Sequence, residues 1–348
     1  MPYNSSKVIL MVLYSSVCTL ALPANCVTAW LTLLQALQGN VLAIYLFCLA
    51  LCELLYASTL PLWIMYIRDN HRWGLGDRAC KVTAYIFFCN IYISILFLCC
   101  ISCDRFVAVV YPLQSRARRH PKVAILVSAG VFVSVGAVFS PVFKVTTNTT
   151  CFEPVLVNET TAIYYYSRFT CGFVVPLFII AYANWQVFKS IRQCMGLSAA
   201  QKARIKRLLT AVVAIFLACF TPYHLVLLIR AAAFSSHKGN TTALCLLERD
   251  FFYTPSVVFL CLCTVHSVAD PIIYLLAMDL RLREDLRHLS WSHWHIRADS
   301  TWLAASRDSE EPRLPTLPTN SGTFPTAVHP PGAQQGMGPS LSALHEEP

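Results

Sequence analysis

Seven long apolar segments determine what this chain of 348 residues can fold into. An α-helix needs about 20 consecutive, mostly apolar residues to cross the hydrocarbon core of a bilayer. Seven windows meet this requirement, at residues 8–34, 41–67, 82–103, 123–143, 163–188, 208–229 and 251–277. Only 13% of all residues are charged, which is unusual for a soluble protein of this length. The sequence therefore predicts an all-α membrane protein, a bundle of seven transmembrane helices numbered here as spans one to seven.

Basic residues and glycosylation acceptor sites predict how the bundle is oriented. Lys and Arg are concentrated between spans three and four, between spans five and six, and after span seven. The positive-inside rule places these segments in the cytoplasm. The Asn-X-Ser/Thr patterns that accept N-glycans all fall on the opposite side, at Asn4, Asn148, Asn158 and Asn240. We expect a plasma-membrane protein with its amino terminus outside the cell and its carboxyl terminus inside.

Two of the sixteen cysteines lie on the predicted outer side at places that suit a disulfide. Cys80 stands at the outer end of span three, and Cys151 lies in the second outer loop. Disulfides form and persist in oxidising compartments. We therefore predict that Cys80 and Cys151 pair.

Short polar motifs interrupt five of the spans in chain order. They are Pro23-Ala24-Asn25-Cys26-Val27, Leu49-Ala50-Leu51-Cys52-Glu53, Asp104-Arg105-Phe106, Cys219-Phe220-Thr221-Pro222 and Asp270-Pro271-Ile272-Ile273-Tyr274. The series resembles the rhodopsin-like receptor family over residues 8–289, with Glu53, Phe106 and Phe220 where the family usually has Asp, Tyr and Trp. The resemblance implies a receptor that activates heterotrimeric G proteins. It also implies an activation switch made of Asp104, Arg105, Phe220, Pro222, Pro271 and Tyr274.

A narrower likeness involves Cys89-Asn90-Ile91-Tyr92, Pro222-Tyr223-His224-Leu225 and the segments 103–109 and 196–202. These segments are similar to the proton-sensing, lysolipid-related group of the same family. This likeness implies a cell-surface receptor for extracellular acidity, for oxidised free fatty acids or for lysolipids.

The switch residues also have a physical interpretation of their own. Asp104 can hold the neighbouring Arg105 guanidinium until another partner competes for it. The alternative is an arginine that merely reaches the membrane interface. Pro222 and Pro271 each remove a backbone hydrogen bond and can act as hinges in spans six and seven.

Polar residues at helical spacing predict a buried cluster in the middle of the bundle. Asn90 and Ser94 share one face of span three, and His266 and Asp270 share one face of span seven. Together with Asn25 and Glu53 they are expected to form one network, which is either a proton site or a permanently satisfied structural network. Similar clusters in relatives bind sodium, but His266 stands where the family usually has Asn. We therefore predict no metal site and no cofactor.

Acid sensing has two candidate locations. Protonation of Glu53 and Asp270 would favour a tightly packed, active bundle, so activity would rise as the pH falls. The alternative sensors are His71 and His237 in the outer loops, because histidine titrates near pH ~6.5.

One cation is a candidate ligand contact. Arg168 lies about a turn and a half inside span five, where it could bind a ligand carboxylate or phosphate, pair with a protein acid, or reach water. Further candidates for contact with a ligand are Tyr223, His224 and Arg230.

The last part of the chain is expected to differ from residues 1–289, which form the receptor domain. Residues 279–289 are amphipathic and should lie on membrane lipids as helix 8. The proline-containing segment 290–348 is predicted to be a disordered cytoplasmic tail, and Ser306 and Ser309 suggest regulation by receptor kinases and arrestin.

Other classes of protein fit less well. A transporter or channel would show internal repeats or polar residues along several spans. A retinal protein would need a lysine within a span. The sequence shows neither a set of residues typical of an enzyme active site nor a nucleic-acid-binding pattern. The remaining alternatives are a constitutively active receptor and a seven-helix scaffold protein.

Overall fold

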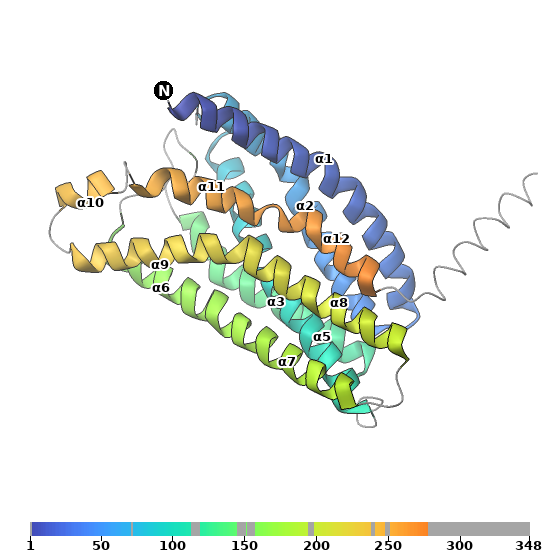
Figure 1. Ribbon diagram of the computed structural model, residues 1–348. Helices are drawn as coiled ribbons and strands as arrows, with labels where there is room; N and C mark the ends of the chain where they lie inside the picture. Colours follow the sequence, from blue (N-terminus) through green and yellow to red (C-terminus); the bar gives the residue numbers. More distant parts are fainter. Residues whose placement is uncertain are drawn as a thin grey trace, which may run out of the picture. The chain divides into compact units, whose positions relative to one another are not determined.

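The computed structural model describes residues 2–70, 72–112, 119–144, 151, 157–193, 198–237, 241–247 and 251–277. In this part of the chain, seven helical runs are long and apolar enough to cross a membrane (Figure 1). The predicted bundle of seven spans is therefore confirmed. The predicted helix 8, the tail, the boundary at 289/290, His71, Asn148 and Asn240 lie outside the described residues.

The first four spans are simple helices. Spans one, two and three are α1 (Pro2–Leu37), α2 (Val41–Arg68) and α3 (Asp77–Val110), and span four is α5 (Pro121–Phe139) with the 3-10 turn η1 (Ser140–Lys144). Their starts follow from local sequence. The side chain of Asn40 accepts hydrogen bonds from the backbone N–H groups of Leu42 and Ala43, and α5 begins with a proline, which suits the first turn of a helix.

Spans five, six and seven are interrupted. Span five is α6 (Glu159–Phe169), η2 (Thr170–Val174) and α7 (Val175–Gln193). Span six is α8 (Ala199–Ile215), η3 (Phe216–Phe220) and α9 (Thr221–Ser236), followed by the short α10 (Thr241–Leu247). Span seven is α11 (Tyr253–Cys263) and α12 (His266–Ala277). Both η2 and η3 are π-helical turns, and each lies just before a proline, Pro176 or Pro222. Such turns widen a helix locally and often mark functional sites.

Two carbonyls released by prolines are bound by side chains of span one. A proline at position i cannot donate to the carbonyl of residue i−4. Pro271 thus frees the Ser267 carbonyl, which accepts a 2.8 Å hydrogen bond from Asn25 Nδ2. Pro61 likewise frees the Ala57 carbonyl, which lies 3.7 Å from the thiol of Cys18. These bonds join span one to spans seven and two.

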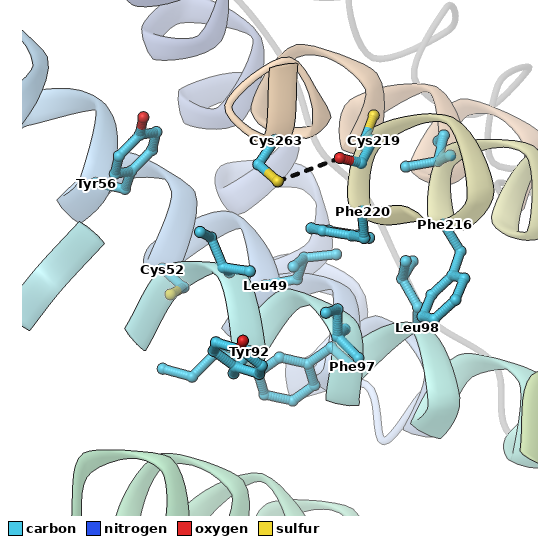
Figure 2. Close-up of a cluster of buried hydrophobic side chains, with 14 of the residues drawn as sticks. Leu49, Cys52, Tyr56, Tyr92, Phe97, Leu98, Phe216, Cys219, Phe220 and Cys263 are labelled. Atoms are coloured by element: carbon cyan, nitrogen blue, oxygen red, sulfur yellow. Dashed lines mark hydrogen bonds between the residues drawn. The ribbon is translucent and has the colours of Figure 1, made fainter. Parts of the chain in front are cut away.

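The core lies between α2, α3, η3 and the two helices of span seven. Figure 2 shows Leu49 and Cys52 of α2, Phe97 and Leu98 of α3, and Phe220 of η3 among the packed side chains. The Cys263 thiol at the end of α11 donates a 3.2 Å hydrogen bond to the Cys219 carbonyl (Figure 2). The interior that surrounds the polar clusters is therefore apolar and closely packed.

Candidate functional site

Glu53 is the centre of a buried polar cluster. It is completely buried on α2 and accepts a 2.6 Å hydrogen bond from Ser94 Oγ and a 3.2 Å bond from Asn90 Nδ2. Ser267 Oγ also donates to this carboxylate. His266 Nε2 lies 3.2 Å from Glu53 Oε1, and His266 Nδ1 contacts the Cys263 carbonyl. Spans two, three and seven therefore meet at one carboxylate.

Asp270 completes the cluster but lacks a hydrogen bond. Its side chain is buried, and neither carboxylate oxygen has a partner among the described residues. Ligand atoms of Glu53, His266 and Asp270 lie within 4.8 Å of one another, close enough for one cation to contact all three. An unpaired buried carboxylate is costly, so the cluster favours any state in which Asp270 is neutralised.

The sequence predicted most members of this cluster but not all of their contacts. Asn25 donates to the Ala21 and Ser267 carbonyls, so it supports the backbone of span seven rather than touching the carboxylates. Ser267 was missed, although a serine beside His266 in a span was a visible signal. Cys52 was also missed, and its thiol donates to Asn90 Oδ1 over 3.1 Å.

A second polar centre surrounds Arg168, which is only 8% exposed at the end of α6. Arg168 Nε donates to the Tyr92 hydroxyl over 2.8 Å, and Nη2 donates to the Tyr223 hydroxyl over 2.7 Å. Its guanidinium carbon lies 5.0–5.6 Å from five ring centroids, those of Phe88, Tyr92, Phe139, Tyr164 and Tyr223. We call these five rings and Arg168 the arginine cage.

The arginine cage brings together three of the four predicted ligand contacts. Tyr223 belongs to it, and His224 Nε2 lies 3.1 Å from the Tyr92 hydroxyl. Arg230 stands apart, with its guanidinium 5.3 Å from the ring centroid of Tyr165. The sequence allowed three kinds of partner for Arg168, namely a ligand anion, a protein acid or water. Burial excludes bulk water, and no carboxylate in the described ranges pairs with it.

A third site lies at the end of the bundle opposite Cys80. Arg105 is bonded to Asp104, as expected. Asp104 also accepts two hydrogen bonds from Arg119, at 2.8 and 3.1 Å, a partner that the sequence did not indicate. Next to this pair is a cavity of about 360 Å³. Its lining is formed by Gln35, Gln38, Asn40, Leu42, Arg105, Gln201, Arg204, Ile205, Leu208, Leu276 and Ala277.

Arg204 ties spans six and seven together beside this cavity. Its Nε donates to the Leu276 carbonyl over 3.1 Å, and its Nη2 donates to the Ala277 carbonyl. These are the last carbonyls of α12, where a positive charge is favourable. Tyr274 of the predicted switch lies on the same helix and accepts a 3.3 Å hydrogen bond from Gln35 Nε2.

The remaining predicted residues lie near the Cys80 end. The predicted disulfide between Cys80 and Cys151 is confirmed, with Cα atoms 5.7 Å apart. Asn158 is exposed, and its side chain caps α6 by accepting from Thr161 N. His237 is exposed at the end of α9, with Nδ1 3.1 Å from the Ala233 carbonyl. For Asn4, only its place within α1 is described.

Comparison with known proteins agrees with this architecture. Residues 24–274 match the family described as 7 transmembrane receptor (rhodopsin family). The chain is 60% identical to Probable G-protein coupled receptor 132 of Homo sapiens, over 95% of this chain and 87% of that protein.

More distant relatives match a smaller part of the chain. Identity is 33% to Lysophosphatidic acid receptor 4 of Mus musculus, over 87% of this chain and 82% of that protein. It is 30% to G-protein coupled receptor 68 of Mus musculus, over 78% and 74% respectively. The spans, the motifs and these matches coincide, and the chain therefore belongs to the rhodopsin family of seven-transmembrane receptors.

Proposed function

We propose that this receptor binds an anionic lipid in the arginine cage and activates a heterotrimeric G protein. The observation that carries this proposal is the buried cation of Arg168, which has two tyrosine hydroxyls and five rings around it but no carboxylate among the described residues. A buried charge requires a counter-ion. A ligand carboxylate or phosphate would supply it, and the aromatic rings suit an apolar chain next to the headgroup.

Oxidised free fatty acids and lysolipids share this chemistry, since each joins an anionic group to a long hydrocarbon chain. The relationship to a receptor named for lysophosphatidic acid supports this ligand class. The test is G-protein activation in cells by hydroxyoctadecadienoic acid, compared with its uncharged methyl ester and with oleoyl lysophosphatidate. We expect the free acid or the lysolipid to activate and the ester to fail.

The arginine itself provides the decisive variant. Arg168→Gln should raise the half-maximal concentration by about 100-fold, because removal of one partner from a buried ion pair costs about 3 kcal/mol. Arg72→Gln, at an exposed arginine, is the matched control and should change little. An unchanged response of Arg168→Gln at equal surface expression would contradict the proposal.

We also propose which side of the membrane each end of the bundle faces. The end with Cys80, Cys151 and Asn158 would be extracellular, and the cavity beside Arg105 would face the cytoplasm and the G protein. The tail would bind receptor kinases and arrestin. An epitope before Lys7 should be accessible to antibody on intact cells, and an epitope after residue 340 only after permeabilisation.

A second function, acid sensing, is favoured by the unpaired carboxylate of Asp270. Glu53, Asp270 and His266 face one another there, and the Cys52 thiol lies beside them. We propose that protons bind this cluster more tightly in the active bundle than in the inactive one, so that activity rises as the pH falls.

Charge-neutral variants test this idea. Glu53→Gln combined with Asp270→Asn imitates the protonated cluster and should raise basal activity while flattening the pH response. His71→Phe and His237→Phe should keep the response. The opposite pattern would place the sensor in the outer loops.

A further inference from the structure

A continuous line of hydrogen bonds leads from the arginine cage to the kink of span six. It starts at Arg168 Nε, which is 2.8 Å from the Tyr92 hydroxyl. The same hydroxyl is 3.1 Å from His224 Nε2. The other nitrogen of this ring, Nδ1, is 2.7 Å from the Phe220 carbonyl. Three side chains from spans five, three and six thus form a single path.

The chemistry of the partners gives this path a direction. A carbonyl oxygen only accepts hydrogen bonds, so Nδ1 of His224 must carry the proton. In the neutral ring Nε2 is then an acceptor, and the Tyr92 hydroxyl donates to it. The same hydroxyl oxygen accepts from Arg168, which can only donate. Each donor is therefore matched to an acceptor, from the guanidinium to the backbone of span six.

The path ends where span six is able to bend. Phe220 is the last residue of the π-helical turn η3 and precedes Thr221 and Pro222. The ring of His224 stacks on Phe173 with centroids 4.9 Å apart. Phe173 stacks in turn on Phe216 of η3 at 5.4 Å. A movement of the His224 ring is thereby transmitted to both ends of η3, by a hydrogen bond to Phe220 and by ring packing to Phe216.

A ligand anion would disturb the path at its start. The anion competes for the N–H groups of Arg168 that now bind Tyr92. Buried polar groups need partners, and neighbouring hydrogen bonds strengthen one another. Loss of the Arg168 donor therefore weakens the bond between Tyr92 and His224 and frees the His224 ring. We infer that Tyr92 and His224 are coupling residues, through which binding of a ligand to Arg168 changes the kink at Pro222. This inference rests on the proposed lipid-binding function.

The test separates ligand binding from activation. Tyr92→Phe and His224→Phe each keep an aromatic ring but remove the hydrogen bond between the two residues. The first change also removes the bond from Arg168, and the second also removes the bond to the Phe220 carbonyl. With radiolabelled hydroxyoctadecadienoic acid as the probe, His224→Phe, which leaves Arg168 and the five rings of the arginine cage in place, should bind with an affinity within about twofold of the wild type at equal surface expression. At saturating probe, the ratio of active to inactive receptor should fall about fivefold, as expected for one neutral hydrogen bond. The double variant should lose less than the sum of the two single variants, because the bond between Tyr92 and His224 is already lost in each of them.

Tyr85→Phe is the matched control. Tyr85 is on the same helix, and its hydroxyl donates a 3.0 Å hydrogen bond to the Gly136 carbonyl, away from the path. This variant should keep the full maximal response. Full activation by Tyr92→Phe, additive losses in the double variant, or a loss of binding by His224→Phe parallel to its loss of activation would each overturn the coupling role.

The two proposals fail in different ways. If the wild-type receptor responds to neither the fatty acid nor lysophosphatidate, or if Arg168→Gln still responds as the wild type does, the anionic-lipid proposal and the coupling role fall together. If the wild type responds, Arg168→Gln does not, and Tyr92→Phe activates fully, only the coupling role is wrong.

Discussion

At the scale of single residues, the close approach of Gly172 to Tyr92 shows how a ligand site depends on a missing side chain. A Cβ atom at Gly172 would collide with Cε1 of the Tyr92 ring and lie 3.0 Å from its Cδ1. The glycine sits in the π-helical turn η2, four residues after Arg168. Its lack of a side chain lets Tyr92 reach both Arg168 and His224.

Gly172→Ala should therefore push the Tyr92 ring out of place. We expect a destabilisation of about 1–3 kcal/mol from overpacking, together with a weaker response to the lipid probe. Thermal denaturation of the purified receptor and the half-maximal concentration measure these two effects. Gly130→Ala is the control, because nothing lies within 4 Å of a Cβ atom there. Equal behaviour of the two variants would show that Tyr92 adjusts freely.

Two buried asparagines should respond in opposite ways to replacement by leucine. Asn25 supplies the donor for the Ser267 carbonyl, so Asn25→Leu should cost about 1–3 kcal/mol. Asn184 is 2% exposed and, within the described residues, its side-chain amide has no hydrogen-bond partner. Asn184→Leu should therefore leave the melting temperature unchanged or raise it. A large loss of stability in Asn184→Leu would mean that its amide has a partner such as a buried water.

At the scale of helices, Arg204 holds the beginning of α8 against the end of α12. Opening of the cavity beside Arg105 requires these helix ends to separate. Arg204→Gln should weaken the link and raise the basal ratio of active to inactive receptor about tenfold, which corresponds to loss of hydrogen bonds from a charged group. Basal G-protein activation at equal surface expression measures this. Arg207→Gln, at an exposed position on the same helix, should have no such effect.

The spans and much of the carboxylate cluster could be predicted from the sequence, because residue types determine hydropathy and residue numbers determine helical spacing. Asn90, Ser94, His266 and Asp270 share faces that spacing alone reveals. The contacts of Asn25, Arg119 and Arg204 could not be predicted. Asn25 and Arg204 bind backbone carbonyls, which carry no sequence signal, and Arg119 reaches Asp104 from another segment. Of the arginine cage, the sequence indicated Arg168 and Tyr223 but not the other four rings, which come from spans three, four and five.

At the scale of the whole bundle, the arginine cage and the carboxylate cluster are joined by aromatic packing. Phe173 touches His224 on one side and Phe216 on the other. Phe220 lies 5.8 Å from Phe216 and 5.0 Å from the His266 ring, measured between centroids. Figure 2 shows Phe216 and Phe220 inside the same apolar core. The two polar centres are therefore expected to influence each other.

If lipid and protons both favour the active bundle, each must strengthen the other by the same factor. A fall in pH should lower the half-maximal concentration of lysophosphatidate, and the lipid should shift the midpoint of the pH response upward. Measuring both shifts provides the test. Two independent shifts, with no effect of one ligand on the other, would show that the centres are not coupled.

The attachment of span one to carbonyls of other spans has a consequence for how the receptor is made. Span one leaves the ribosome first, and chains are assembled from the amino terminus onward. Cys18 and Asn25 are therefore already in the bilayer when the proline-containing spans two and seven arrive with their unpaired Ala57 and Ser267 carbonyls. Hydrocarbon offers such carbonyls no partner. Span one is therefore expected to supply the donors for these two carbonyls as the bundle assembles.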